Sequence, residues 1–273
     1  MWPVLWATAA LAGEPQWWLF NRLGVAYNPL GAIDDFRAEV RAPLPWEQPG
    51  SLLLDGTYVG GGLGLEVSPA YLRVGPRFSV QPVAFFDVTG QARLLYYFGV
   101  FDDLMGFDDL DVDYDDAARA THSEDAYPAL GLDVDLRPEL KIKVGHFFAV
   151  DQWEFHYYRL PGTEPYVFEP YIHLLMARQD VTFTHDAVVG AFVWDPPDRR
   201  EFIVAAISEN THAVATRDHS WSVGPLVAFS VSNRFAVPKF AVLSRIYIRD
   251  QTLTIPSVYV AIAAEWEVGL PMR

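Results

Sequence analysis

The sequence predicts an all-β fold: a single antiparallel transmembrane β-barrel of about twelve strands, with two longer extracellular loops. Three observations support this prediction. Apolar and polar residues alternate with a period of two over runs that are longer than the roughly 5–6 residues of a typical soluble strand. Short turn signals separate these runs. Finally, the chain lacks the roughly 18 continuous apolar residues of a spanning helix, so it can cross a membrane only with strands.

The clearest alternation lies in residues 72–89, which read LRVGPRFSVQPVAFFDVT. Every even position from Leu72 to Val88 is apolar, whereas the odd positions include Arg73 and Arg77. Lipid offers the backbone no hydrogen-bond partner, so a spanning sheet must close on itself, with apolar side chains outside and polar ones inside. A soluble β-sandwich or a lipocalin-like barrel gives the same alternation with shorter strands, and both remain alternatives.

The same pattern predicts the remaining strands in order along the chain. The twelve expected strands cover residues 17–28, 33–44, 52–67, 72–89, 91–103, 130–137, 140–156, 180–195, 201–215, 219–232, 234–249 and 253–270. Two long connections remain, residues 104–129 and 157–179, although FEPYIHLLMA within the second could form a strand. With both chain ends in the periplasm, an even strand number places both long connections outside the cell. The prolines on the apolar face are expected at bulges; they are Pro76, Pro82, Pro225, Pro238 and Pro256.

Composition narrows the class of protein further. The 273 residues carry 35 acidic and 20 basic side chains, and the net charge of −15 argues against nucleic acid as a partner. The chain has no cysteine, which excludes disulfides and thiolate metal sites. The apolar start, which ends in Ala10-Leu11-Ala12, predicts a signal peptide over residues 1–12; an apolar cap on a soluble domain is the alternative. Residues 13–273 are expected to form one barrel domain.

These features resemble the outer-membrane β-barrels of Gram-negative bacteria. More narrowly, NRLGVAYNPLG (21–31), SPAYLRVGP (68–76) and YYFGVF (96–101) resemble segments of uncharacterised predicted barrels of that class. The resemblance implies a location in the bacterial outer membrane, with membrane lipid as the surrounding partner, and it implies no activity. The last strand departs from the class, because an aromatic residue usually ends it and this chain ends in GLPMR.

Basic residues on the expected inward faces are the main candidates for a functional site. The candidates for lining the lumen are Arg73, Arg77, Arg93, Lys141, Lys143, Lys239, Arg245 and Arg249, together with Glu265 and Glu267. Arginine binds carboxylates through its planar fork, and this favours a narrow channel that prefers small anions. Alternatively, inward carboxylates, among them Asp87 and Asp151, neutralise the basic residues and the barrel is filled.

Two further groups of residues suggest other chemistry. The acidic loop 101–125 contains Asp109, Asp111, Asp113, Asp115 and Asp116, which predict a weak calcium site or else a solvated anionic loop. The dipeptides His122-Ser123 and His219-Ser220 would suit a lipid-acting hydrolase, yet neighbours on a strand point to opposite faces, so neither dipeptide is a dyad. We therefore expect no enzyme and no cofactor, and favour a passive channel or a structural barrel, with an outer-membrane hydrolase as the alternative.

Overall fold

The computed structural model describes residues 14–27, 31–100, 104–112, 114–121, 126–194, 201–230, 239–249 and 258–271. Within these residues, twelve strands close into one antiparallel barrel. The barrel strands are β1 (Gln16–Tyr27), β2 (Gly31–Pro43), β3 (Tyr58–Val67), β4 (Tyr71–Val83), β5 (Phe86–Tyr97), β7 (Ala129–Val144), β8 (Phe147–Arg159), β11 (Gln179–Trp194), β12 (Phe202–Ala213), β13 (His219–Ser230), β14 (Lys239–Arg249) and β15 (Val258–Pro271). A second, three-stranded sheet contains β6 (Met105–Phe107), β9 (Tyr166–Glu169) and β10 (Leu174–Ala177), and α1 (Asp116–Thr121) is a short helix.

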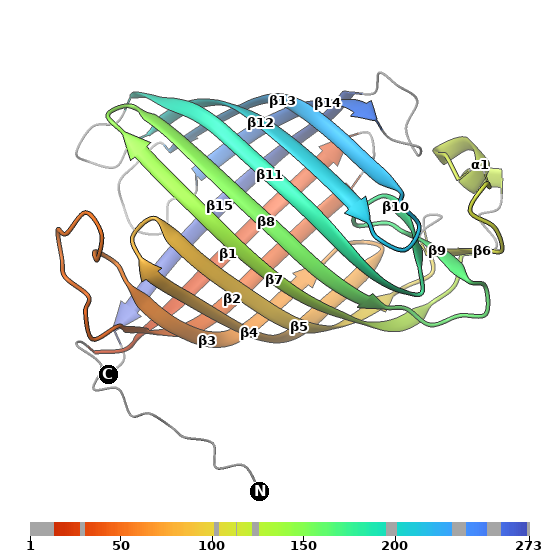
Figure 1. The fold of residues 1–273 in the computed structure, drawn as a ribbon, viewed down its shortest axis with the longest axis horizontal. Coiled ribbons are helices and arrows are strands. Elements are labelled where there is room, and N and C mark those ends of the chain that lie inside the picture. Colours follow the sequence, from red (N-terminus) through yellow and green to blue (C-terminus); the bar gives the residue numbers. More distant parts are fainter. Residues whose placement is uncertain are drawn as a thin grey trace, which may run out of the picture.

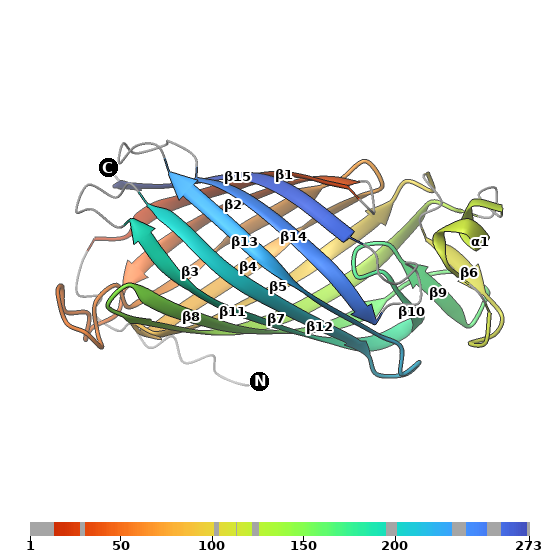
Figure 2. The same cartoon turned by 90° about the horizontal axis from the view of Figure 1, so that it is seen from above.

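The first and last strands close the barrel, since β1 pairs with β15 from Gln16 opposite Pro271 to Tyr27 opposite Val260. The start of β1 and the end of β15 lie at one end of the cylinder, which we call the terminal end (Figure 1). The small sheet and α1 lie at the opposite end, the loop end, in both views (Figures 1 and 2). The predicted closed barrel is therefore confirmed, and both long connections leave it at the loop end. Among the described helices, none is long and apolar enough to cross a bilayer.

Alternating residues separate the two faces of the wall. Val74, Phe78, Leu94 and Ile262 point outward and are exposed, as are many other apolar side chains of the strands. Their neighbours on the opposite face, such as Arg73, Arg77 and Arg93, are buried inside. The wall thus has an apolar outer surface and a polar interior, which is the arrangement that a lipid environment requires.

Two of the expected boundaries between strands were wrong. Residues 72–89 are not one strand: β4 ends at Val83 and β5 begins at Phe86, with a bulge beside Pro82. The bulge and the tight turn reverse the chain where alternation alone predicted a continuous strand. Conversely, Arg137-Pro138-Glu139 lies within β7, and the chain turns at Gly145, which adopts a positive φ of 60°. Glycine tolerates that conformation without strain, so the turn forms there.

The prolines of the outer face are accommodated in different ways. Pro82 adjoins the bulge between Val80 and Val83, as expected. Pro76 pairs with Leu63 of β3, and Pro225 pairs with Ala206 of β12, within otherwise regular ladders. Pro238 and Pro256 lie outside the described residues.

Close approach between β4 and β5 makes Gly75 sensitive to substitution. A Cβ atom at Gly75 would lie 2.0 Å from the carbonyl oxygen of Ala92 and 2.8 Å from Cα of Arg93. We expect Gly75→Ala to impair folding strongly, because a backbone atom cannot move aside as a side chain can. Gly31→Ala is the control, since nothing lies within 4 Å of that position. Heat-modifiable gel migration after refolding in detergent measures the folded fraction, and equal folded fractions for the two variants would contradict this packing.

Candidate functional site

A network of arginines and carboxylates fills the loop-end half of the interior. Nη2 of Arg93 lies 2.5 Å from Oδ2 of Asp133 and 2.9 Å from Oδ2 of Asp135. Arg73 contacts Glu66 at 3.6 Å and Asp133 at 3.9 Å. The side chains of Arg73 and Arg93 are 0% and 3% exposed, so these are charges removed from water. Charges buried in this way persist only when each is paired.

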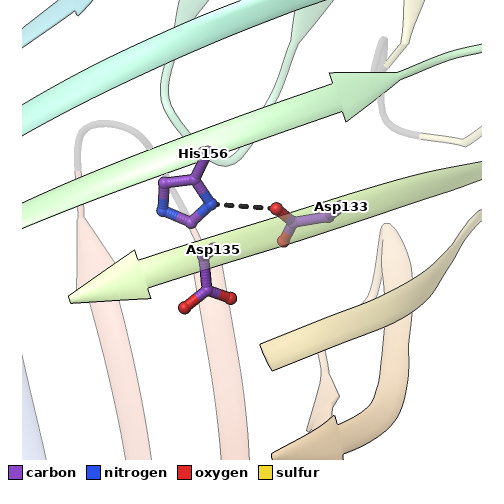
Figure 3. A group of neighbouring side chains, drawn as sticks. All are labelled: Asp133, Asp135 and His156. Atoms are coloured by element: carbon purple, nitrogen blue, oxygen red, sulfur yellow. Dashed lines mark hydrogen bonds and ion pairs between the residues drawn. The ribbon is translucent and has the colours of Figure 1, made fainter. Parts of the chain in front are cut away.

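Asp133, Asp135 and His156 form the one group of three potential metal ligands found among the described residues (Figure 3). Their ligand atoms lie within 4.8 Å of one another. However, the guanidinium of Arg93 already occupies the space between the two carboxylates. Nδ1 of His156 lies 2.9 Å from Asp133, and its Nε2 lies 3.2 Å from Glu154.

Two carboxylates that can only accept hydrogen bonds hold both nitrogens of His156 as donors, so the ring has no lone pair for a metal. The arrangement therefore suits an ion-pair cluster with an imidazolium, and the donor set does not fit a metal ion.

Residues 161–178, which we call the plug segment, enter the loop end of the barrel. Glu169 at the end of β9 anchors the segment, since its Oε1 accepts hydrogen bonds from Arg73 at 3.1 Å and from the hydroxyl of Tyr97. Its Oε2 accepts from the backbone N–H groups of Tyr171 at 2.9 Å and Ile172 at 2.8 Å. The guanidinium of Arg73 also stacks on the ring of Tyr171, 3.8 Å from its centroid. One buried carboxylate thus joins the plug segment to the barrel wall.

Apolar packing and a second arginine hold the rest of the plug segment. Val167, Leu174 and Met176 pack in a buried cluster with wall residues that include Leu95 and Tyr158. Nη2 of Arg178 lies 2.7 Å from Glu164, and Nη1 of Arg178 also bonds to the carbonyl oxygen of Pro161, so the two ends of the segment are tied together. The loop end of the barrel therefore has a packed core of the kind found in soluble domains.

Solvent access increases toward the terminal end of the interior. Lys141 contacts Asp87 at 2.8 Å and Glu139 at 2.6 Å, yet its side chain is 49% exposed. Lys239 contacts Glu201 at 3.3 Å and is 57% exposed. The interior is therefore packed near the plug segment, and these two lysines near the terminal end are accessible to solvent.

Arg22 of β1 is more accessible to solvent than the arginines of the packed side. Arg22 lies near the middle of β1 and points inward, where it contacts Asp35 at 3.4 Å, and its side chain is nevertheless 40% exposed. Asp35 also binds Arg37 at 2.5 Å, so two arginines share one carboxylate here. Water therefore reaches a charged arginine at mid-height inside the barrel.

The remaining predicted lumen residues occupy different environments. Arg77 is buried against Glu39, and Arg245 contacts Glu209 at 2.5 Å. Lys143 lies over the ring of Phe192 at 4.0 Å, and Arg249 is exposed at the loop end of β14. Glu265 is the register partner of Arg22, and Glu267 lies 4.0 Å from Arg41. That these residues line a conducting path stays a prediction.

Asp151 was wrongly expected to face the interior. It points outward beside Trp153, whose ring Nε1 donates to it at 3.0 Å. The expectation continued the alternation of residues 140–144 through to 156 as a single strand. The turn at Gly145 begins a new strand and resets which positions face outward.

Several interior residues were missed by the sequence analysis: Arg22, Arg37, Arg41, Arg137, His156 and Glu169. The arginines of β1 and β2 follow the same alternation as the predicted set, so their inward position could have been inferred. Glu169 lies in a connection without regular alternation, and no local sequence signal marks it as a partner of Arg73.

Two aspartates of the acidic loop make local hydrogen bonds to the backbone. Oδ1 of Asp109 accepts the backbone N–H of Asp111 at 3.2 Å, and Oδ1 of Asp115 accepts that of Ala118 at 2.7 Å. These contacts are typical of a turn and of a helix N-terminus. The side chains of Asp113 and Asp116 lie outside the described part. Calcium binding by this loop stays a prediction.

The two His-Ser dipeptides do not provide a dyad in the described region. Ser220 is buried inside the barrel, whereas His219 lies on the other face with its ring 6.1 Å from that of His212. His122 and Ser123 lie outside the described residues.

Comparisons with known proteins give only distant matches, all to solved structures. No protein-family model matches the chain, and no curated protein matches it. Among solved structures, it is similar to the β domain of the Bordetella autotransporter BrkA, with a TM-score of 0.47, 12% identity and coverage of 93% of this chain and 99% of that one. It is also similar to the Vibrio cholerae outer-membrane protein OmpT (TM-score 0.40, 6% identity, 93% and 98% coverage) and to the Pseudomonas putida toluene transporter TodX (TM-score 0.36, 8% identity, 95% and 89% coverage).

At such low identities and TM-scores, the likeness carries no conclusion about the activity of this chain. The predicted class and its location in the bacterial outer membrane are confirmed at the level of the fold, by the closed sheet and its apolar outer surface.

Proposed function

We propose that the protein is a passive, non-enzymatic outer-membrane channel, narrowed by its plug segment and weakly selective for small anions. The observation that carries this proposal is the hydrated Arg22 at mid-height of the interior. A filled structural barrel would have dry, fully paired charges on every side. The packed network between β4 and β8 has this character, and the accessible Arg22 of β1 does not.

The distribution of charge supports a preference for anions, although the net charge of the protein is −15. The field inside a low-dielectric wall depends on the nearest charges. Arg22 and Arg37 both contact the carboxylate of Asp35, and Glu265 is the register partner of Arg22. The buried arginines contribute little, because carboxylates neutralise them. We therefore expect a weaker preference than eight unpaired basic residues would give.

Planar-bilayer recording under a salt gradient tests this function. We expect a small single-channel conductance and a reversal potential on the anion-selective side. Arg22→Ser should shift the reversal potential toward zero, because it removes the accessible charge. Arg217→Ser is the matched control, since Arg217 is exposed in the connection between β12 and β13, outside the barrel.

Two results would contradict the proposal. A cation-selective reversal potential would show that the accessible arginines do not set the field. Electrical silence over many insertions of refolded protein would identify a filled, structural barrel instead.

A further inference from the structure

Polar side chains interrupt the apolar outer surface in the central part of β8 and β11. Nε2 of His185 lies 2.5 Å from Oδ1 of Asp151, and Trp153 donates to the other carboxylate oxygen at 3.0 Å. The ring of Trp153 lies 4.7 Å from that of His185. The side chains of His185 and Asp151 remain 35% and 41% exposed on the face that meets lipid.

The strand registers extend this group into a continuous patch. His185 is flanked by Trp153 of β8 and Asn210 of β12, and Asn210 is opposite Trp221 of β13. In the adjacent row, Ala187 is flanked by Asp151 and Ser208. Ser208 accepts a hydrogen bond from the indole of Trp221 at 3.1 Å. We call this group the outer-face patch: Asp151, Trp153, His185, Ala187, Ser208, Asn210 and Trp221.

The outer-face patch is unfavourable against hydrocarbon. Ionisable groups on the lipid face of a barrel are most destabilising at mid-depth, because lipid offers neither charge nor hydrogen bonds. The apolar side chains around the patch, such as Phe155 and Val189, show that this part of the wall is not otherwise adapted to water. A protein partner would supply the hydrogen bonds that lipid lacks.

We propose that the outer-face patch pairs with the same patch of a second copy of this chain, which forms a dimer in the plane of the membrane. A two-fold interface requires a self-complementary surface. The patch carries an acid, a base and the Asn210 amide, which both donates and accepts, so two copies can satisfy each other. Ala187 and the exposed Ala206 beside the patch let the two walls approach closely, and Trp153 and Trp221 border the contact.

Cysteine cross-linking in membranes tests the dimer, because the chain has no cysteine of its own. We expect oxidised Ala206→Cys to run as a disulfide-linked dimer on a non-reducing gel. Ala92→Cys is the matched control: Ala92 is also an exposed alanine of the outer face, but it lies on β5, away from the patch. It should remain monomeric. The proposal would be overturned if Ala206→Cys formed no disulfide-linked dimer. It would also be overturned if both variants formed the same fraction of dimer.

A second variant tests whether the polar residues of the outer-face patch contribute to dimerisation or are merely unfavourable against lipid. Asp151→Leu combined with His185→Leu keeps the fold and removes the polar contacts, and we expect roughly tenfold weaker dimerisation through Ala206→Cys. If this variant cross-linked as efficiently as Ala206→Cys alone, Asp151 and His185 would not contribute to the dimer contact. The protein could instead release fatty acid from phosphatidylethanolamine vesicles, and Asp151→Asn could abolish that release. This result would show that Asp151 and His185 are catalytic, and it would also overturn the dimer proposal.

Discussion

Replacing Glu169 by alanine is expected to release the plug segment and to lower the free energy of unfolding by about 3–5 kcal/mol. The substitution leaves the fully buried Arg73 without its closest carboxylate and removes the acceptor for two backbone N–H groups and the Tyr97 hydroxyl. Breaking a buried pair by removing one partner is costly because the other charge stays desolvated. Urea titration of refolded protein measures the loss of stability.

Hydrogen exchange over residues 161–178 measures the release of the plug segment itself, and bilayer conductance should rise with it. Glu164→Ala is the control within the same segment. Its contact with Arg178 lies at the surface, so we expect a change of about 0–1 kcal/mol. If Glu169→Ala left both exchange and stability unchanged, Glu169 would not be the anchor of the segment.

Arg93→Met should destabilise the barrel by a similar amount, about 3–5 kcal/mol. Methionine fills much of the same volume, but Asp133 and Asp135 then face each other without the guanidinium that contacts both. His156 still contacts Asp133 at 2.9 Å, and Arg137 still contacts Asp135 at 3.0 Å. These contacts offset only part of the charge, because neither residue contacts both carboxylates as Arg93 does. The midpoint of the heat-induced shift in gel migration should fall markedly.

Lys141→Met provides the comparison for Arg93→Met. Lys141 also bridges two carboxylates, but water reaches it near the terminal end, and we expect a change of about 0–1 kcal/mol. Equal effects of the two substitutions would contradict the distinction between a packed loop-end half and a hydrated terminal half.

Alternation along the chain is a local property, and it predicted the wall well. A strand turns successive side chains to opposite faces, so Val74 and Phe78 against Arg73 and Arg77 define outside and inside without any tertiary information. The alternation carries no information on where a strand ends. It therefore missed the reversal at Ala84 and Phe85, and it continued past Gly145, which placed Asp151 on the wrong face.

The sequence by itself determined that this protein is a β-barrel with an apolar exterior and a charged interior, because lipid and the two-residue period leave few other arrangements. Only the tertiary structure decided which charges pair and which remain in water. Arg73 and Glu169 are 96 residues apart, and their contact exists only once the barrel has closed and the plug segment has entered it. Likewise, Asp151 and His185 meet on the lipid face because the register of β8 against β11 brings them together.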